Sequence, residues 1–222
     1  MRFYQKIDGG VHVSAREYDV AADAALSEGQ VVRLSEGRVM PALAGQSTAV
    51  LGVAAESHSG SADALNPRAN GTKVLVMDDP AAVYCCAAPQ ITAVGGSETT
   101  LVFAEGRSFS ADDFNGGFVR LLRKGAGSTN GDAVGTLRAV SDFAVTPGES
   151  GTLTLERGGA PNAGDVYALF PPVGFAKGNL NDGRDGIVLT ASSNLALRVV
   201  GRDETSNSIC VMAKKHVFAV EA

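Results

Sequence analysis

Short runs of apolar residues recur along the chain and are separated at close intervals by glycine and polar turn residues. Val31, Val32 and Leu34 form one such run, a Ser-Glu-Gly turn follows it, and the next run starts at Val39. This arrangement is typical of β-strands joined by tight turns. No long stretch repeats its apolar positions every 3.6 residues, so the pattern predicts an all-β fold and argues against a helical one.

Longer strands are expected in the second half of the chain. They are predicted at 99–103, 118–122, 135–140, 151–155, 165–170, 187–189, 195–200 and 208–212, with a closing segment at 216–220. Polar and apolar residues alternate from Thr152 to Leu155, as expected when one face of a sheet meets water. Strands at such spacing, with turn clusters between them, indicate a β-sandwich or a barrel.

A chain of 222 residues is long enough for two small β-domains. We interpret residues 1–18 as an N-terminal arm, 19–90 as a first, small β-domain and 97–222 as a second β-rich domain. The junction between the two domains is placed at residues 89–97. Whether the last strands of the second domain return to the first is left open.

Two segments of the first domain carry a resemblance to a known family. They are Gly29-Gln30-Val31-Val32-Arg33-Leu34 and Ala49-Val50-Leu51-Gly52-Val53-Ala54. In this order they resemble the opening of the lambda-type head decoration (cement) proteins of tailed phages, in which such a series builds a small β-domain. Together with strands expected at 71–76 and 83–84, the resemblance covers about a third of the chain.

The resemblance implies a structural protein of a phage virion, with no catalytic activity and no cofactor. Such a protein is made in the cytoplasm of the bacterial host and binds the outer surface of the capsid. There it bridges subunits of the major capsid protein and stabilises the expanded shell. The resemblance further implies a homo-oligomer, most simply a trimer at three-fold sites.

The arm is the expected contact with the capsid. Phe3 and Tyr4 would be its apolar anchors, because aromatic side chains bury much area at little entropic cost, and Arg2 and Lys6 would set the register. The alternative that residues 1–18 include an ordinary edge strand of the first domain stays open.

Charge and hydropathy argue against two classes of partner. The net charge is −5 at a pI near 5.2, and the basic residues are scattered apart from Arg123-Lys124 and Lys214-Lys215, so nucleic acid is not expected. No stretch reaches the ~18 apolar residues of a membrane span, and the start of the chain lacks the apolar core of a signal peptide. No membrane partner is therefore expected.

No motif for metal binding or catalysis is found. Asn130-Gly131-Asp132 and residues 181–186 carry the oxygen ligands that calcium prefers, but neither has the spacing and the glutamate of an EF-hand, so turns are expected there. Residues 124–131 are rich in glycine without the lysine of a phosphate loop, and they are predicted to be a hairpin tip. The Asp78-Asp79-Pro80 segment is predicted to start a turn, with a carboxylate that caps backbone amides.

The histidines and cysteines give no metal pattern either. His12, His58 and His216 lie far apart in the sequence. The three cysteines are an odd number with two adjacent, which is a poor disulfide framework, and they are expected to be buried thiols: Cys85, Cys86 and Cys210.

Other classes of function remain as alternatives. One is a β-rich head-fibre or tail subunit of the same kind of virion. Another is a carbohydrate-binding module, or an enzyme whose site is assembled from loops. Aromatic platforms for sugars would be scarce, because the chain has no Trp and only 4 Tyr.

Overall fold

The computed structural model describes residues 2–6, 14–21, 24–42, 48–58, 73–104, 109, 111–146, 150–173, 178–180, 187–189, 197–213 and 215–218. At 2–6, 146, 178–180 and 187–189 it describes the backbone alone. Within these ranges the chain contains no helix and forms 17 strands in three sheets. The predicted all-β fold is therefore confirmed.

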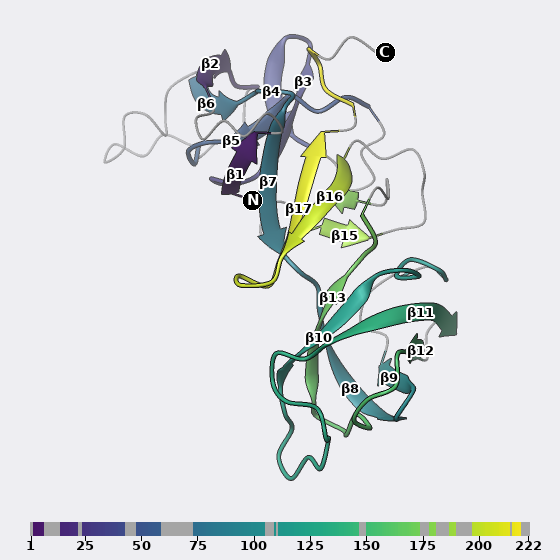
Figure 1. Cartoon of the computed structure of the whole chain (residues 1–222). Helices are drawn as coiled ribbons and strands as arrows, with labels where there is room; N and C mark the ends of the chain where they lie inside the picture. Colours follow the sequence, from purple (N-terminus) through teal and green to yellow (C-terminus); the bar gives the residue numbers. More distant parts are fainter. Residues whose placement is uncertain are drawn as a thin grey trace. The chain divides into compact units, whose positions relative to one another are not determined.

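The chain divides into two compact units. Figure 1 draws the whole chain, coloured along the sequence. The first unit comprises Met1–Ala87, Gly178–Val188 and Ser193–Ala222, and the second comprises Ala88–Lys177 and Leu189–Ser192. Two open sheets lie in the first unit, and a closed barrel forms the second.

The first open sheet has five strands in the order β2-β6-β5-β3-β4. Their bounds are Ala15–Asp19 (β2), Lys73–Met77 (β6), Gly52–Ala54 (β5), Val31–Ser35 (β3) and Arg38–Pro41 (β4). Glu36 and Gly37 join β3 to β4 with φ values of 51° and 77°, the two positive values that a two-residue hairpin turn of the favoured hand requires. The Ser-Glu-Gly turn predicted from the sequence is thus confirmed.

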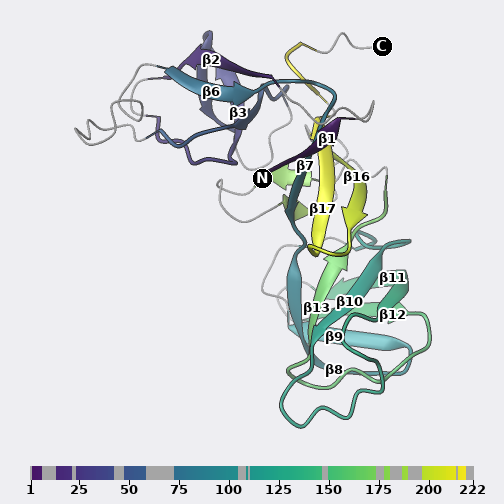
Figure 2. The same cartoon turned by 60° about the vertical axis from the view of Figure 1, so that its left-hand side comes forward.

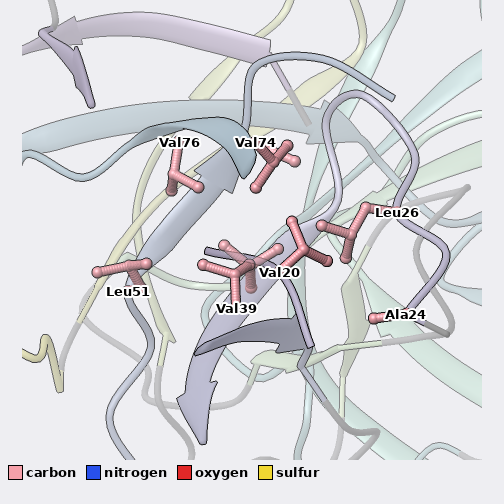
Figure 3. Close-up of a cluster of buried hydrophobic side chains, with 9 residues drawn as sticks. Val20, Ala24, Leu26, Val39, Leu51, Val74 and Val76 are labelled. Carbon is pink, nitrogen blue, oxygen red and sulfur yellow. The ribbon is translucent and has the colours of Figure 1, made fainter. Parts of the chain in front are cut away.

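One face of this sheet carries an aliphatic core. Figure 3 shows its side chains converging from the strands and from the segment after β2. The buried members are Val20, Ala24, Leu26, Val32, Val39, Leu51, Ala54, Val74 and Val76. Each fully buried Val or Leu contributes roughly 1.5–3 kcal/mol, which makes this cluster the main source of stability of the sheet.

The second open sheet has six strands in the order β1-β7-β17-β16-β14-β15. Their bounds are Arg2–Lys6 (β1), Ala82–Ala87 (β7), Ser208–Ala213 (β17), Leu197–Asp203 (β16), Gly178–Leu180 (β14) and Ile187–Leu189 (β15). Figure 2 shows β17 beside β16. Strands β7 and β17 are buried along nearly their whole length, as expected for the centre of a sheet covered on both faces.

The barrel closes in the order β10-β11-β12-β9-β8-β13. Its strands are Gln90–Ser97 (β8), Thr100–Ala104 (β9), Phe118–Arg123 (β10), Leu137–Thr146 (β11), Ser150–Leu155 (β12) and Val166–Phe170 (β13). Four phenylalanines, Phe103, Phe109, Phe114 and Phe143, pack ring against ring in its core, with centroids 5.1–6.2 Å apart. Half-buried and buried residues alternate along β12, as its sequence predicted.

The boundary between the units lies between Ala87 and Ala88, next to the junction expected at residues 89–97, but most of that segment is the strand β8 and not a linker. Ile91 and Ala93 are buried and alternate with exposed neighbours, the pattern of a strand with one wet face. Its glycines do not mark a linker. A Cβ at Gly96 would lie 2.3 Å from the Thr100 carbonyl oxygen, so glycine is needed there for the close approach of two backbones.

The boundaries of the second unit also differ from the expected domain 97–222. The unit begins at Ala88, and the strands after residue 196 belong to the first unit, because β17 pairs with β7 and β16 pairs with β17. The expected arm 1–18 contains β1, which pairs antiparallel with β7, and β2, which pairs with β6. These pairings join residues far apart in the sequence, so no local pattern announces them.

A buried polar network around Arg138 of β11 joins the loops that follow β8, β10 and β12. The Arg138 guanidinium donates to the carbonyl oxygens of Glu98, Glu156 and Gly159 and approaches the Asp132 carboxylate at 3.5 Å. Arg138 is 3% exposed, so each of these acceptors replaces a water that the guanidinium has lost.

A second set of hydrogen bonds continues this network. Asp165 accepts from the backbone amides of Gly125 at 2.7 Å and Asn162 at 3.0 Å, and from the Asn130 side chain at 2.9 Å. Burial alone would raise the pKa of Asp165, but these hydrogen bonds outweigh it and lower the pKa. Asn130, which lies in a segment considered for calcium, therefore serves the loop structure.

Candidate interaction surface

The residues expected to contact a capsid lie on β1, at one edge of the six-stranded sheet. Arg2 is placed opposite Cys85, Phe3 opposite Tyr84 and Lys6 opposite Ala82. The register shifts between Phe3 and Gln5, which leaves Tyr4 at a β-bulge. Bulges are frequent at sheet edges, where they twist a strand and re-aim a side chain. The side chains of β1 lie outside the described part of the structure.

A polar cluster lies where β6 ends. The Asp78 carboxylate is 2% exposed, accepts a hydrogen bond from the Tyr18 hydroxyl and pairs with the Arg16 guanidinium at 3.4 Å. Arg16 and Tyr18 are two positions apart on β2, so they share one face of that strand. Next to Asp78, the Met77 carbonyl oxygen accepts a hydrogen bond from the Tyr84 hydroxyl, with 2.8 Å between the two oxygens. This bond connects β6 to β7.

Burial is the main reason that the pKa of Tyr18 rises to about 12, and the hydrogen bond to the negative Asp78 adds to it. Burial, aided by the charges of Asp79 and Asp78, also raises the pKa of Tyr84. Both phenols therefore stay protonated at neutral pH and act as hydrogen-bond donors. The cluster is a set of fixed donors and acceptors that aims the Arg16 side chain.

The C-terminal segment brings an aromatic ring to Arg16. The Val50 amide donates to the Lys215 carbonyl and the Val217 amide donates to the Val50 carbonyl, both at 3.0 Å, which ties this segment to the residues before β5. The Arg16 guanidinium carbon then lies 5.8 Å from the centre of the Phe218 ring, within the range of a cation–π contact.

Arg16, Val217 and Phe218 form an exposed patch, called here the Arg16–Phe218 patch. The Arg16 side chain is 65% exposed, Phe218 is 48% exposed and Val217 is 37% exposed. Arginine and aromatic residues are enriched in protein interfaces, and they supply much of the binding energy there. An arginine fixed over an exposed ring, above a buried carboxylate that orients it, is suited to binding a protein surface.

His216 supports the patch from within. Its ring is 5% exposed, its Nδ1 accepts from the Phe218 amide at 3.1 Å, and its centre lies 5.8 Å from the Phe218 ring. Burial lowers the pKa of His216, against the opposing effects of a backbone contact with Leu51 and of Asp78 and Asp79. The imidazole is therefore neutral at pH 7, with its proton on Nε2.

This arrangement predicts a pH dependence of stability. The folded protein holds fewer protons on His216 than the unfolded chain, so stability is fully present above the ordinary pKa of 6.5 and falls as the pH drops below it. The fall has a slope of at most about 1.4 kcal/mol per pH unit. The His216→Asn variant keeps an acceptor for the Phe218 amide but has no titrating imidazole, so it should lack this contribution to the fall in stability.

Urea unfolding of wild type and His216→Asn between pH 8 and pH 5 measures this effect. The difference between the two chains removes the contribution of the carboxylates they share. A difference that stays constant from pH 7 to pH 5 would contradict the assignment to His216.

The sequence alone did not reveal the patch, although it predicted a turn at Asp78, the carboxylate that orients Arg16. The turn expected at Asp78-Asp79-Pro80 is present, but the carboxylate that caps it is Asp79, which accepts from the Ala81 amide at 2.9 Å. Asp78 instead binds Arg16 and Tyr18. An arginine and a tyrosine two apart in a short strand were the available signal.

Other sequence expectations have separate outcomes. The three cysteines are buried thiols, as predicted. Within the described residues, no group of three or more His, Cys, Asp or Glu side chains is placed to hold a metal ion. Residues 181–186 and His12 lie outside the described residues. No described helix is long and apolar enough to cross a membrane.

Comparison with family models, with curated protein sequences and with solved structures finds no match to this chain. The class that the structure itself defines is an all-β protein of two compact units with an exposed arginine–aromatic patch.

Proposed function

We propose that this chain is a structural protein that binds the outer surface of a tailed-phage capsid and stabilises the expanded shell by bridging coat subunits. The observation that carries the proposal is the position of the two segments that resemble the decoration family. Val31 pairs with Val53 and Val32 with Gly52, so the strands β3 and β5, in which the two segments end, are neighbours in one small sheet.

An exposed patch at the edge of the same sheet supports the proposal. Arg16 of β2 and Phe218 are fixed side by side at its edge, and both are exposed. An interface of about 800 Å² per partner would include this patch and more. Binding only the assembled shell stabilises it by mass action, and a trimer would strengthen modest contacts through raised local concentration.

The test is co-sedimentation of the purified protein with expanded and unexpanded shells of the phage that encodes it. We expect saturable binding to expanded shells, and shells that resist disruption by heat once occupied. Light scattering after size exclusion measures the molar mass of the free protein and of protein released from shells, and this mass shows whether the protein is a trimer. A monomer or dimer that binds neither kind of shell would contradict the proposal and favour a ligand-binding module.

Two double variants locate the contact. Phe3→Ala with Tyr4→Ala removes the anchors proposed on β1, and Arg16→Ala with Phe218→Ala removes the patch. Whichever surface meets the coat, its variant should bind at least tenfold more weakly, since truncating a central interface side chain costs roughly 2 kcal/mol. Arg157→Ala, an exposed barrel arginine, is the control.

Each variant is also unfolded in urea, because β1 is paired to β7 and its substitution could act through the sheet. Weaker binding with an unchanged unfolding midpoint assigns the surface. Unchanged binding by both double variants would remove both surfaces from the proposal.

A further inference from the structure

Two of the three cysteines face each other across the central strands of the six-stranded sheet. Cys85 of β7 and Cys210 of β17 are direct partners in the antiparallel register, and their Sγ atoms are 3.5 Å apart. Directly opposite residues of an antiparallel pair point to the same face, with Cα atoms about 4.5–5.5 Å apart. This lies inside the Cα range of disulfides, so bond formation needs side-chain rotation and little backbone movement.

The surroundings of the pair leave room for that rotation. The position opposite Cys210 on β16 is Gly201, which has no side chain, and a Cβ there would be 3.8 Å from the Cys210 Cβ. The pair belongs to a small apolar cluster with Val83, and Val200 packs against this cluster. Cys86 does not compete, because its Sγ contacts the Ile209 carbonyl at 3.6 Å and successive residues of a strand face opposite ways.

We propose that Cys85 and Cys210 are a redox-active pair that a two-electron oxidant of the peroxide class converts into a cross-strand disulfide between β7 and β17. One thiol attacks a peroxide oxygen, which gives a sulfenic acid and releases water. The second thiol attacks the sulfenic sulfur, which forms the S–S bond and releases a second water. The two thiols lose two electrons and two protons in all, and hydrogen peroxide becomes two waters.

The bond would join residues that are 125 positions apart, and the intervening chain includes the whole of Ala88–Lys177. Closing so long a loop restricts the unfolded chain strongly, so the oxidised protein should be more resistant to heat by roughly 10 °C. Burial raises the pKa of the Cys210 thiol, although its hydrogen bond with Cys85 opposes this. Since the thiolate is the reactive form, the reaction should be slow at neutral pH and faster as the pH rises.

The experiment is oxidation of the full chain with hydrogen peroxide, followed by intact mass, non-reducing peptide mapping and thiol titration after denaturation. We expect a mass loss of two hydrogens, a linked peptide pair that contains Cys85 and Cys210, and one remaining thiol in place of three. The oxidised chain should migrate faster on a non-reducing gel and unfold at a higher temperature, and a phosphine reductant should reverse both changes.

Variants of the three cysteines supply the controls. Cys86→Ala keeps the pair and should respond to peroxide as wild type does, whereas Cys85→Ala and Cys210→Ala should not form the bond. If either of these variants fails to fold, the peptide map of the wild-type chain decides alone. A link that contains Cys86 would overturn the proposal. Three titratable thiols after exposure to peroxide just below the unfolding temperature would also overturn it, because local opening of the structure exposes buried thiols most often there.

Discussion

Replacing Arg138 with methionine is expected to lower the free energy of unfolding of the barrel unit by about 3–5 kcal/mol. Breaking a buried network has this cost because the remaining polar groups stay buried with fewer hydrogen bonds. Arg138 is almost completely buried, and its guanidinium satisfies the carbonyls of Glu98, Glu156 and Gly159. Methionine fills a similar volume but donates nothing. These carbonyls and the Asp132 carboxylate would all lose the guanidinium in a poorly solvated site, and only the Glu98 carbonyl and the Asp132 carboxylate would keep a backbone amide, from Gly158 and Gly159.

Urea unfolding of the full chain, followed by hydrogen exchange of the barrel strands, measures this loss. Arg157→Ala is the control, since Arg157 also pairs with a carboxylate, that of Glu98, but both side chains are mostly exposed. Exposed pairs contribute at most about 1 kcal/mol. If Arg138→Met and Arg157→Ala cost the same, the buried network does not stabilise the barrel.

Local patterns predicted much of the fold, and the structure shows why. The run Val31 to Leu34, the turn at Glu36-Gly37 and the return at Val39 are a hairpin whose contacts are all close in sequence. The alternation of β12 and the strand-rich second half likewise predicted a sandwich or barrel, and the barrel is present. Such features follow from side-chain periodicity and turn chemistry, which one sequence carries.

Features that depend on distant pairing were either missed or, as for the return of the last strands to the first unit, left open. Gly95 and Gly96 resemble a linker in the sequence, and only the approach of Gly96 to the Thr100 carbonyl explains glycine within a strand. The pairing of β17 with β7 likewise has no local signal.

The same limit applies to the candidate surface. Arg16 reaches Asp78 because β2 pairs with β6, and Phe218 reaches Arg16 because Val50 binds the segment around His216. Each of these side chains is ordinary in its own stretch of sequence. Their combination exists only in the folded chain, which is why sequence reasoning selected the aromatic N-terminal segment instead.

Gly52→Ala is expected to have the largest effect in the five-stranded sheet, a loss of roughly 3 kcal/mol or more. A Cβ at Gly52 would lie 2.0 Å from the Met77 carbonyl oxygen and 3.0 Å from the Asp78 Cα. Both are backbone atoms, so no rotamer change relieves the overlap. Strands β5 and β6 must separate, although β5 has only three residues with which to hold its place.

Gly37→Ala is the control in the same sheet. Its φ of 77° is unfavourable for alanine, but a Cβ there meets nothing within 4 Å, so the expected loss is about 1 kcal/mol from backbone strain alone. Urea unfolding with hydrogen exchange of β3, β5 and β6 compares the two. Equal losses would show that the approach of β5 to β6 is looser than the structure has it.

The Gly52 substitution also links the sheet to the candidate surface. Met77 and Asp78 are the residues that it displaces, and Asp78 is the carboxylate that holds Arg16 and Tyr18. Gly52→Ala should therefore weaken shell binding even at low temperature, where the chain remains folded, whereas Gly37→Ala should leave it unchanged. Binding that survives Gly52→Ala in full would separate the Arg16–Phe218 patch from the function proposed for this sheet.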